Sequence, residues 1–530
     1  MSKTRTEMYE YNLALRFQSV VSRYEDRTAI WLSNDERISY AELNRLANRI
    51  ARFLVERGVK EADVVAIAGE KSCQTFAWMI ASLKLGCLYV ILDPDSPVER
   101  LRKILSTCHP TVLVAETDFI NRLATVTSDL GIEIVDQNTL DETITNLNRD
   151  NLLETSNVTG SNPAYIMFTS GSTGFPKGAV MTHANVLNLI DWSNETFSIT
   201  VDDVLTNVNP LYFDNSVFDF YASLFSGATL VPFSKQEVSD PRLLVEKIDA
   251  AGCTLWFSVP SLLMFLQTMK ATDGKHLKSI RRFVFGGEGY PKAKLKALFD
   301  SYTAGSEFFN VYGPTECTCI CSSYLVTKAD FHDLQGLPPL GSIAKNFSYL
   351  VIGEDGRSVP VGQTGELCLL GPNVGRGYYN DPQRTALSFV QNPENDKFID
   401  IMYRTGDLVR LDPADGKLYI EGRKDNQIKH MGYRIELEEI EAALHCLAYV
   451  SEAAALHTNV NGLSRIVAVV ASTQDFDDDH IRRDLKQIVP HYMVPSVFHR
   501  EEMLPKNANG KIDRRHLVEK YVQNRREEQN

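Results

Sequence analysis

The sequence lacks any long, uninterrupted apolar run. Its most apolar stretch, residues 76–93, is interrupted by Lys84 and falls short of the ~20 apolar residues that a membrane-spanning helix requires. The first residues, MSKTRTEMYEYNLALRFQ, contain no apolar segment of signal-peptide length. We therefore expect a cytoplasmic protein that has no membrane partner.

Cysteine and excess positive charge are also scarce. Nine cysteines in 530 residues are an odd number, so at least one is unpaired, which favours a reducing compartment. The 68 Asp and Glu residues outnumber the 55 Lys and Arg residues and give a net charge of −13. Because a nucleic-acid backbone attracts a basic surface, this balance argues against a nucleic-acid partner.

The composition that is present is that of an ordinary globular protein in a long chain. Hydrophobic residues make up 44% and charged residues 23% of the sequence, which excludes wholesale disorder. A single core stops growing near ~250–300 residues. The 530 residues therefore predict one large domain built of sub-lobes and at least one smaller domain.

The hydrophobic pattern changes along the chain. Up to about Leu325, amphipathic helical stretches alternate with short apolar runs such as VVAIAG at residues 64–69, which predicts α/β sub-lobes with buried, largely parallel strands. One predicted helix, over residues 39–58, begins with Ser39 and Glu42 in the spacing of a capping box. After Gly336, short alternating strands between turns rich in glycine and proline predict a β-rich sub-lobe.

A shorter α+β pattern begins at Asp425. We therefore predict the α/β fold class, with a large N-terminal domain over residues 1–424 and a small C-terminal domain over residues 425–530. The large domain would contain two α/β sub-lobes and the β-rich sub-lobe.

The most informative segment is residues 165–178, YIMFTSGSTGFPKG. Glycines let backbone N–H groups approach an anion, hydroxyls add donors, and a lysine adds a positive charge, so this loop is suited to a triphosphate. It is not a Walker A loop, because Pro176 stands where that motif has its second glycine. The alternative is a flexible turn of small residues. The candidate phosphate-binding residues are Thr169, Ser170, Gly171, Ser172, Thr173, Gly174 and Lys177.

This loop resembles the signature of the adenylate-forming superfamily, which includes acyl-CoA synthetases, luciferases and the adenylation domains of nonribosomal peptide synthetases. Four further segments match the family in its own order and extend the resemblance over essentially the whole chain. They are NVYGPTE at 310–316, YRTGD at 403–407, GRKDNQIKHMGYR at 422–434 and PKNANGKIDR at 505–514.

The resemblance implies ATP and Mg²⁺ as cofactors and assigns a role to each motif. Tyr312 would lie near the adenine, Asp407 would bind the ribose hydroxyls, and Arg423 would lie near the ribose and phosphates. Asn310 and Gly313 belong to the same ATP-binding set. The implied catalytic residues are Lys511, Glu316, which would hold Mg²⁺, and Thr315, which would contact the α-phosphate. Asp425 would be the hinge about which a mobile C-terminal domain rotates.

The family runs two half-reactions. A carboxylate first attacks the α-phosphate of ATP, which gives an acyl-adenylate and pyrophosphate. A thiol then attacks the activated carbonyl and AMP leaves. The intact Lys511, Glu316 and Asp407 argue against a catalytically silent binding protein with the same fold.

The segment YFDNSVFDFY at residues 212–221 bears on the substrate. In peptide-synthetase adenylation domains an aspartate in this frame pairs with the α-ammonium of an amino acid, and Asp214 fits that role. The alternative is that Asp214 caps a helix beginning at Ser216. The family's remaining pocket positions are Asn215, Phe218, Ser258, Val284, Gly286, Val311, Cys319 and Ile320.

These pocket residues are uncharged, which favours a small neutral amino acid such as alanine, serine or proline, since a buried charge without a partner costs several kcal/mol. We expect Phe218 to narrow the pocket and Gly286 to widen it. Asn215 and Ser258 would bind a substrate hydroxyl or satisfy each other. The layout is similar to that of D-alanyl carrier protein ligases.

The thiol acceptor is inferred from the end of the sequence. Only 16 residues follow Arg514, which are too few for a carrier domain. We therefore expect a freestanding adenylation enzyme that loads the phosphopantetheine thiol of a separate carrier protein in trans. The competing hypothesis is an acyl- or aryl-CoA ligase that uses coenzyme A.

Overall fold

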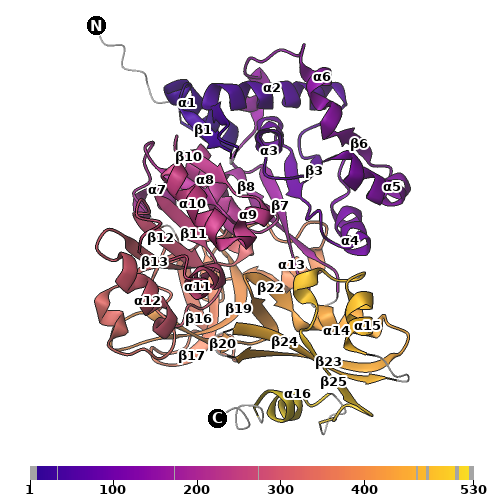
Figure 1. The fold of residues 1–530 in the computed structure, drawn as a ribbon, viewed down its shortest axis with the longest axis vertical. Coiled ribbons are helices and arrows are strands. Elements are labelled where there is room, and N and C mark those ends of the chain that lie inside the picture. Colours follow the sequence, from indigo (N-terminus) through magenta and orange to yellow (C-terminus); the bar gives the residue numbers. More distant parts are fainter. Residues whose placement is uncertain are drawn as a thin grey trace. The chain divides into compact units, whose positions relative to one another are not determined.

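The structure is a computed structural model that describes residues 9–32, 34–171, 174–272, 274–345, 347–460, 463–472, 477–507 and 512–523 (Figure 1). The chain forms two compact units. Unit 1 consists of Met1–Leu92, Cys108–Met167 and Gly178–Gly422, and unit 2 consists of Asp93–Thr107, Phe168–Lys177 and Arg423–Asn530. Each unit is described by itself.

The first sheet has six strands in the order β6-β5-β3-β4-β7-β8. Neighbouring strands from β6 to β7 are parallel, and β3 is buried along its whole length, as the apolar run VVAIA predicts. The strands are β3 (Val64–Ala68), β4 (Leu88–Ile91), β5 (Val112–Ala115), β6 (Glu133–Asp136), β7 (Pro163–Thr169) and β8 (Lys177–Thr182). The helices of unit 1 in this region are α2 (Tyr40–Glu56), α3 (Cys73–Leu85), α5 (Thr117–Leu130) and α6 (Leu140–Ile144), whereas α4 (Val98–Cys108) belongs to unit 2 except for Cys108.

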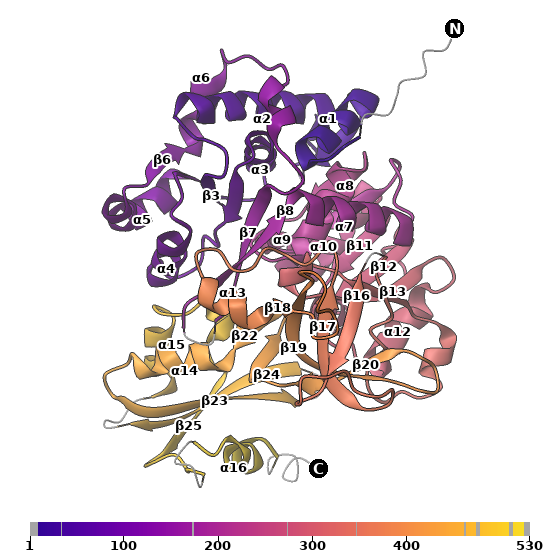
Figure 2. The same ribbon diagram turned by 180° about the vertical axis from the view of Figure 1, so that it is seen from behind.

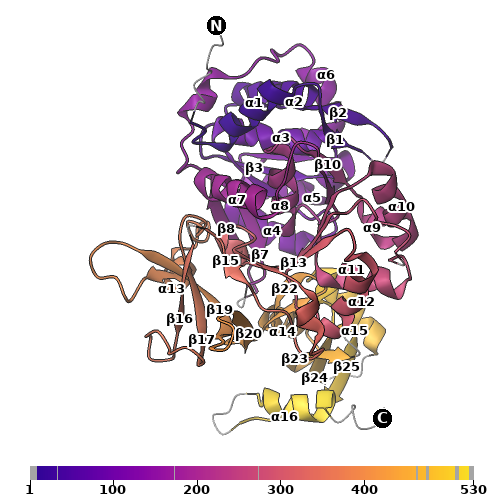
Figure 3. The same ribbon diagram turned by 90° about the vertical axis from the view of Figure 1, so that its left-hand side faces the viewer.

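The second sheet of unit 1 has nine strands in the order β15-β14-β13-β12-β11-β9-β10-β1-β2. Figure 3 labels β1, β2, β10, β13 and β15 of this sheet. The strands between β13 and β1 in this order are parallel to their neighbours. The edge strands β14 and β15 on one side and β2 on the other are antiparallel to theirs. The strands are β1 (Thr28–Trp31), β2 (Arg37–Ser39), β9 (Val204–Asn207), β10 (Thr229–Pro232), β11 (Leu255–Ser258), β12 (Arg282–Gly286), β13 (Glu307–Tyr312), β14 (Ser322–Leu325) and β15 (Ser342–Ile343). Its helices are α1 (Leu13–Tyr24), α7 (His183–Thr196), α8 (Asn215–Leu224), α9 (Lys235–Ser239), α10 (Pro241–Ala251), α11 (Pro260–Thr268) and α12 (Lys292–Tyr302).

A third, antiparallel sheet forms the β-rich part of unit 1, and Figure 2 shows its strands most openly. Its order is β16-β17-β19-β18, and β20 pairs with β19. The elements are β16 (Ser348–Ile352), β17 (Thr364–Leu370), α13 (Pro382–Ser388), β18 (Phe389–Gln391), β19 (Ile401–Leu411) and β20 (Leu418–Arg423).

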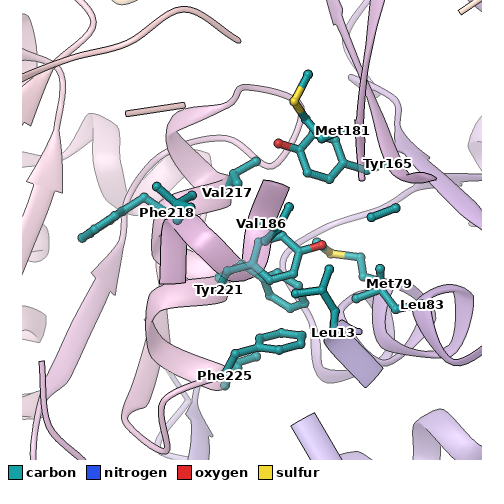
Figure 4. Close-up of a cluster of buried hydrophobic side chains, with 14 of the residues drawn as sticks. Leu13, Met79, Leu83, Tyr165, Met181, Val186, Val217, Phe218, Tyr221 and Phe225 are labelled. Carbon is teal, nitrogen blue, oxygen red and sulfur yellow. The ribbon is translucent and has the colours of Figure 1, made fainter. Parts of the chain in front are cut away.

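Helix α8 lies in the main apolar core of unit 1. Figure 4 shows its side chains Val217, Phe218 and Tyr221, and that of Phe225 just after the helix, close to side chains from α1, α3, α7 and the β7–β8 region. Each fully buried side chain of this size contributes roughly 1.5–3 kcal/mol to stability. Because Asp214 immediately precedes α8, this packing fixes the helix that carries part of the predicted substrate pocket.

Unit 2 contains a hairpin, a three-stranded sheet and short helices. The hairpin turns at Met431 and Gly432, which both have positive φ, as a two-residue turn between twisted strands requires. The elements from residue 423 onward are β21 (Gln427–His430), β22 (Tyr433–Glu436), α14 (Leu437–His445), β23 (Val450–Val460), β24 (Leu463–Ser472), α15 (Asp478–Leu485), β25 (Val497–Glu501) and α16 (Arg514–Val518). In the sheet, β23 and β24 are antiparallel, and β24 and β25 are parallel.

The structure confirms the predicted α/β fold class, with its β-rich part and its α+β C-terminal part. It also confirms the capping box at α2, where Ser39 Oγ accepts from Glu42 N and the Glu42 carboxylate accepts from Ser39 N. Among the described residues, none of the helices combines the length and apolar character needed to cross a bilayer.

Candidate active site

The nucleotide motif of unit 1 begins at the carboxyl end of strand β13. Ligands of parallel sheets bind at this end of the strands, and Asn310 and Tyr312 are the last polar side chains of β13. The Tyr312 hydroxyl donates a hydrogen bond of 2.5 Å to Asp407 Oδ2 on β19. Burial and the neighbouring Asp407 raise the pKa of Tyr312 well above its usual value, so the phenol remains a donor. The structure therefore brings the predicted adenine and ribose residues into contact.

The next two predicted residues also meet. The Thr315 hydroxyl donates a 2.5 Å hydrogen bond to Asp214 Oδ2. Asp214 precedes α8, but its side chain makes no capping hydrogen bond, and its backbone is helical rather than extended. The helix-cap alternative for Asp214 is therefore wrong. The carboxylate lies instead against the hydroxyl predicted to contact the α-phosphate.

Glu316 is fully buried in the short helical turn Thr315–Cys317. One of its oxygens, Oε1, accepts a 2.7 Å hydrogen bond from the Tyr378 hydroxyl. Sequence reasoning missed Tyr378; the only signal was its place in the GRGYY segment at 375–379. Within the described residues there is no cluster of three or more His, Cys, Asp or Glu side chains that could hold a metal. A single hard carboxylate still fits Mg²⁺, which is usually held by one or two carboxylates together with phosphate oxygens and waters.

The predicted pocket residues gather at the same edge of the nine-stranded sheet. Ser258 ends β11, Gly286 ends β12 with Val284 two residues before it, and Val311 lies near the end of β13. In a parallel sheet these ends meet at one edge. The other pocket positions, Asn215, Phe218, Cys319 and Ile320, lie on α8 and on the segment after Glu316.

The structure shows the surroundings of two pocket residues, Gly286 and Ser258. A Cβ added at Gly286 would lie 2.5 Å from the Val311 carbonyl oxygen, so only glycine fits beside this part of β13. Ser258 Oγ accepts from Trp256 Nε1 at 2.7 Å and donates to the Val259 carbonyl at 3.0 Å, so its hydroxyl does not depend on Asn215.

Phe218 is held rigidly. It is fully buried, and its ring packs edge-on against Phe197 and Phe257, with ring centroids 5.5 and 5.0 Å away. Such edge-to-face pairs add to the burial of each ring. The residue predicted to narrow the pocket is therefore part of the packed core.

The segment after Glu316 has a strained backbone. Thr318 and Cys319 both adopt positive φ, at 62° and 72°, which costs energy for residues with a side chain and is concentrated at functional sites. A Cβ added at Gly313 would lie 2.2 Å from the Cys319 carbonyl oxygen, so only glycine permits this fold. Burial, followed by the charge of Asp214, raises the pKa of the Cys319 thiol well above its usual value, and the thiol is neutral.

The predicted phosphate loop lies in unit 2, where it contacts residues 434–439. Ser170 Oγ donates to the Arg434 carbonyl at 2.7 Å and accepts from Glu436 N at 3.1 Å. Gly171 N donates to Glu439 Oε2 at 3.3 Å. Lys177 Nζ lies 3.1 Å from Glu436 Oε1, and both side chains are largely buried. Two donors of the loop, Gly171 N and Lys177 Nζ, therefore bind carboxylates.

Two glycines shape this loop. A Cβ added at Gly171 would lie 2.1 Å from the Phe175 carbonyl oxygen, and Gly174 has a φ of +75°. Thr169, which ends β7, is buried. The predicted loop residues Ser172 and Thr173, and the predicted catalytic Lys511, lie outside the described residues.

Arg423 and the predicted hinge Asp425 form a bidentate ion pair, with Nε to Oδ1 at 2.6 Å and Nη2 to Oδ2 at 2.8 Å. Burial raises the pKa of Asp425, but the hydrogen bonds and charge of Arg423 outweigh it and hold the pKa below its usual value. Asp425 is therefore ionised at neutral pH.

Comparison with known proteins identifies the family. The model of the AMP-binding enzyme family matches residues 17–379, and that of the AMP-binding enzyme C-terminal domain matches residues 439–511. The chain belongs to the AMP-binding enzyme family. Its relatives include the dimodular nonribosomal peptide synthase of Bacillus subtilis (strain 168), 34% identical over 489 residues, or 92% of this chain and 20% of that protein. Tyrocidine synthase 1 of Brevibacillus parabrevis is 32% identical over 506 residues, or 95% of this chain and 44% of that protein.

This AMP-binding enzyme thus spans less than half the length of these two relatives. Solved structures show the same fold. The Vibrio cholerae adenylation domain AlmE, in complex with glycyl-adenosine-5′-phosphate, has a TM-score of 0.82 at 24% identity, covering 98% of this chain and 100% of that one. The fused NpsA-ThdA di-domain from Klebsiella oxytoca has a TM-score of 0.82 at 23% identity, covering 93% and 94%.

Proposed function

We propose that this AMP-binding enzyme activates an α-amino acid as its aminoacyl-adenylate, releases pyrophosphate and transfers the aminoacyl group to a thiol. The observation that carries the proposal is the hydrogen bond between Thr315 and Asp214. It places a carboxylate, suited to an α-ammonium group, against the hydroxyl assigned to the α-phosphate. An amino acid bound there would present its carboxylate to the phosphate that it attacks.

The nucleotide roles follow the same geometry. Tyr312 would face the adenine while Asp407 binds the ribose, and their mutual hydrogen bond keeps both side chains in place. Thr315 would contact the α-phosphate and Glu316 would hold Mg²⁺. When bound, Mg²⁺ would neutralise charge that develops on the phosphate oxygens. The phosphate loop of residues 169–177 would bind the β- and γ-phosphates.

The small C-terminal domain would complete the reaction. In this proposal residues 1–424 bind the substrates, Asp425 is the hinge, and Lys511 on the small domain stabilises the transition state as a positive charge. Arg423, next to the hinge, would reach the ribose and phosphates once its pairing with Asp425 changes.

The substrate we favour is a small neutral amino acid such as alanine, serine or proline. Among the described pocket residues, Asp214 alone carries a charge, so a charged substrate side chain would have no partner and would cost several kcal/mol. Phe218 is fully buried and packs against two rings, which supports a small side chain. The glycyl-adenylate held by AlmE agrees with this size.

The acceptor we favour is the phosphopantetheine thiol of a carrier protein, because the relatives are peptide synthases. The second candidate is an acyl- or aryl-CoA ligase. It is favoured by a shared fold with the o-succinylbenzoate CoA synthetase of Bacillus subtilis, at a TM-score of 0.81 and 22% identity.

Pyrophosphate exchange into ATP tests the proposal directly. The panel contains the twenty amino acids, D-alanine, fatty acids and benzoic acids, each at saturating concentration with Mg²⁺. We expect exchange with one or a few small neutral amino acids and none with the other acids. Exchange confined to fatty or aryl acids would replace the proposal by the second candidate, and transfer to coenzyme A or to a phosphopantetheinylated carrier protein then identifies the acceptor.

A further inference from the structure

Tyr378 contacts the carboxylate to which the proposed function assigns Mg²⁺. Its hydroxyl donates to Glu316 Oε1 at 2.7 Å across 62 residues of sequence, and both side chains are buried. A hydrogen bond to an ionised carboxylate is among the strong ones. The phenol therefore fixes the position of one oxygen of the Glu316 carboxylate.

The segment that carries Tyr378 also binds the backbone around it. Gly375 N donates to the Glu316 carbonyl at 2.9 Å. Residues 376–379 run antiparallel to β8, the strand that follows the phosphate loop, through hydrogen bonds between Arg376 and Val180, Val180 and Gly377, and Tyr379 and Gly178, at 2.8–3.0 Å. Segment 375–379 is thus tied both to the turn of Glu316 and to β8.

Two glycines keep this segment close to its neighbours. A Cβ added at Gly375 would lie 2.2 Å from Met181 Cε and 2.7 Å from the Val180 carbonyl oxygen. Gly377 has a φ of +110°, and a Cβ there would lie 2.4 Å from Thr385 Cγ2. A side chain at Gly375 would push the segment away from β8, and one at Gly377 would push it away from Thr385, so either would move the Tyr378 hydroxyl.

The ring of Tyr378 is held by other rings. It packs edge-on against Phe389 at a centroid distance of 5.6 Å, and Phe389 packs against Tyr403 at 5.0 Å. Tyr403 lies on β19, four residues before the predicted ribose residue Asp407. Tyr378 N also donates to Thr385 Oγ1 at 2.9 Å. These contacts leave the Tyr378 side chain a single well-packed rotamer.

We propose that Tyr378 is a positioning residue for the metal-binding carboxylate. It holds Glu316 Oε1 so that the carboxylate has one defined orientation toward Mg²⁺, and it links that orientation to β8 and to β19. The inference rests on the proposed function, in which Glu316 binds Mg²⁺ beside the nucleotide. Partners that orient a ligand in this way commonly change metal affinity 10–100-fold when they are removed.

The test is the effect of Mg²⁺ on nucleotide affinity rather than on turnover. Calorimetry gives the Kd of β,γ-methylene-ATP without Mg²⁺ and with Mg²⁺. The Kd without Mg²⁺ divided by the Kd with Mg²⁺ is the ratio that reports how much the metal strengthens binding. We expect Tyr378→Phe to lower this ratio about tenfold while the metal-free Kd and the melting temperature stay close to those of the wild type. Tyr379→Phe is the matched control, because successive residues of an extended segment point to opposite faces.

A double-mutant cycle with Glu316→Gln tests whether Tyr378 acts through Glu316. We expect Tyr378→Phe to have no further effect on the ratio in the Glu316→Gln background, since no charged carboxylate is then left to orient. An equal further fall would overturn the inference. A Tyr378→Phe ratio equal to that of the wild type, or a metal-free Kd that weakens as much as the metal-bound one, would also overturn it.

The same data separate the inference from the proposed function. If Glu316→Gln leaves the wild-type ratio unchanged, the metal does not bind at Glu316, and the proposed metal site and the inference both fail. If Glu316→Gln lowers the ratio and Tyr378→Phe does not, only the inference fails. Should Tyr378→Phe yield no folded protein, Thr385→Val, which loosens the backbone of Tyr378, takes its place. An unchanged ratio in that variant overturns the inference.

Discussion

Two short hydrogen bonds join residues from motifs that lie far apart in the sequence. Thr315 binds Asp214 across 101 residues, and Tyr312 binds Asp407 across 95. In both pairs a hydroxyl donates to a carboxylate that is assigned to a substrate. The hydroxyl therefore orients the carboxylate before the substrate arrives, which reduces the reorganisation needed on binding.

The first prediction concerns Asp214. Asp214→Asn keeps the shape of the side chain but removes the charge that would pair with an α-ammonium. We expect kcat/KM for the preferred amino acid in pyrophosphate exchange to fall about 100-fold, since losing one partner of a buried charge pair costs about 2–5 kcal/mol. The Kd of ATP should change little. Unchanged exchange with the amino acid would remove the reason for that substrate class.

The second prediction concerns Tyr312. Tyr312→Phe removes the hydrogen bond to Asp407 and should weaken AMP binding about tenfold, because hydrogen bonds to charged groups contribute roughly 1.5–3 kcal/mol. Calorimetry with AMP measures the loss. Tyr324→Phe is a matched control, since its hydroxyl also donates to an aspartate, Asp330, at 2.7 Å. Equal losses in the two variants would contradict a specific role for Tyr312.

At the scale of elements, the starts of helices α1 and α7 are joined by a buried histidine. His183 is fully buried and accepts a 3.1 Å hydrogen bond from Leu13 N through Nδ1. Burial lowers the pKa of His183 from 6.5 to about 3. The neutral imidazole is therefore the form that holds the two helices together.

This pKa predicts how stability depends on pH. The unfolded chain takes up the proton first as the pH falls, so the contribution of His183 is complete above pH 6.5 and is lost between about pH 6.5 and 3. As the pH falls through that window, the free energy of unfolding of the wild type should decrease by about 1.4 kcal/mol per pH unit more than that of His183→Asn. The asparagine keeps a hydrogen-bond acceptor but does not titrate. Urea unfolding at pH 7, 6 and 5 measures the difference. Parallel pH profiles for the two proteins would contradict the assignment.

The phosphate loop and the start of helix α14 form a second pair of elements. Lys177 and Glu436 make a largely buried ion pair, and Gln427 Nε2 donates to the same Glu436 oxygen at 2.8 Å. While this pair is intact, the lysine of the loop is committed to a carboxylate. A phosphate group would have to compete with Glu436 for it.

Glu436→Gln should therefore strengthen binding of pyrophosphate several-fold and lower the free energy of unfolding by about 3 kcal/mol, the usual cost of breaking a buried pair. Calorimetry with pyrophosphate and urea unfolding measure the two effects. Glu438→Gln is the control, because Glu438 lies two residues further on and binds Asn426 instead. Weaker pyrophosphate binding in Glu436→Gln would show that Glu436 supports the loop rather than competing with its ligand.

The sequence predicted well whatever depends on local order. The capping box at Ser39 and the buried strand within the apolar run at residues 64–69 both follow from patterns of a few neighbouring residues. The contact from Tyr378 to Glu316 could not be predicted, because it depends on how residues 375–379 pack against β8.

At the scale of the whole molecule, the two units divide the predicted site. Asp214, Tyr312, Thr315, Glu316 and Asp407 belong to unit 1, whereas the phosphate loop, Arg423 and Asp425 belong to unit 2. A protein ending after Lys424 should keep AMP affinity within about threefold of the full chain, because Tyr312 and Asp407 bind each other without any residue beyond Lys424. Calorimetry with AMP tests this, and loss of AMP binding by a folded fragment would contradict it.

Unit 2 is also discontinuous in sequence, and this has a consequence for recombination. Glu439 pairs with Arg100, and Glu436 pairs with Lys177, so residues from three separate stretches of the gene make one buried network. If a C-terminal domain were exchanged between relatives at Asp425, its residues at positions 436 and 439 would be separated from their partners at positions 177 and 100. Chimeric enzymes built at that junction should function best when the segments 93–107 and 168–177 are transferred together with it.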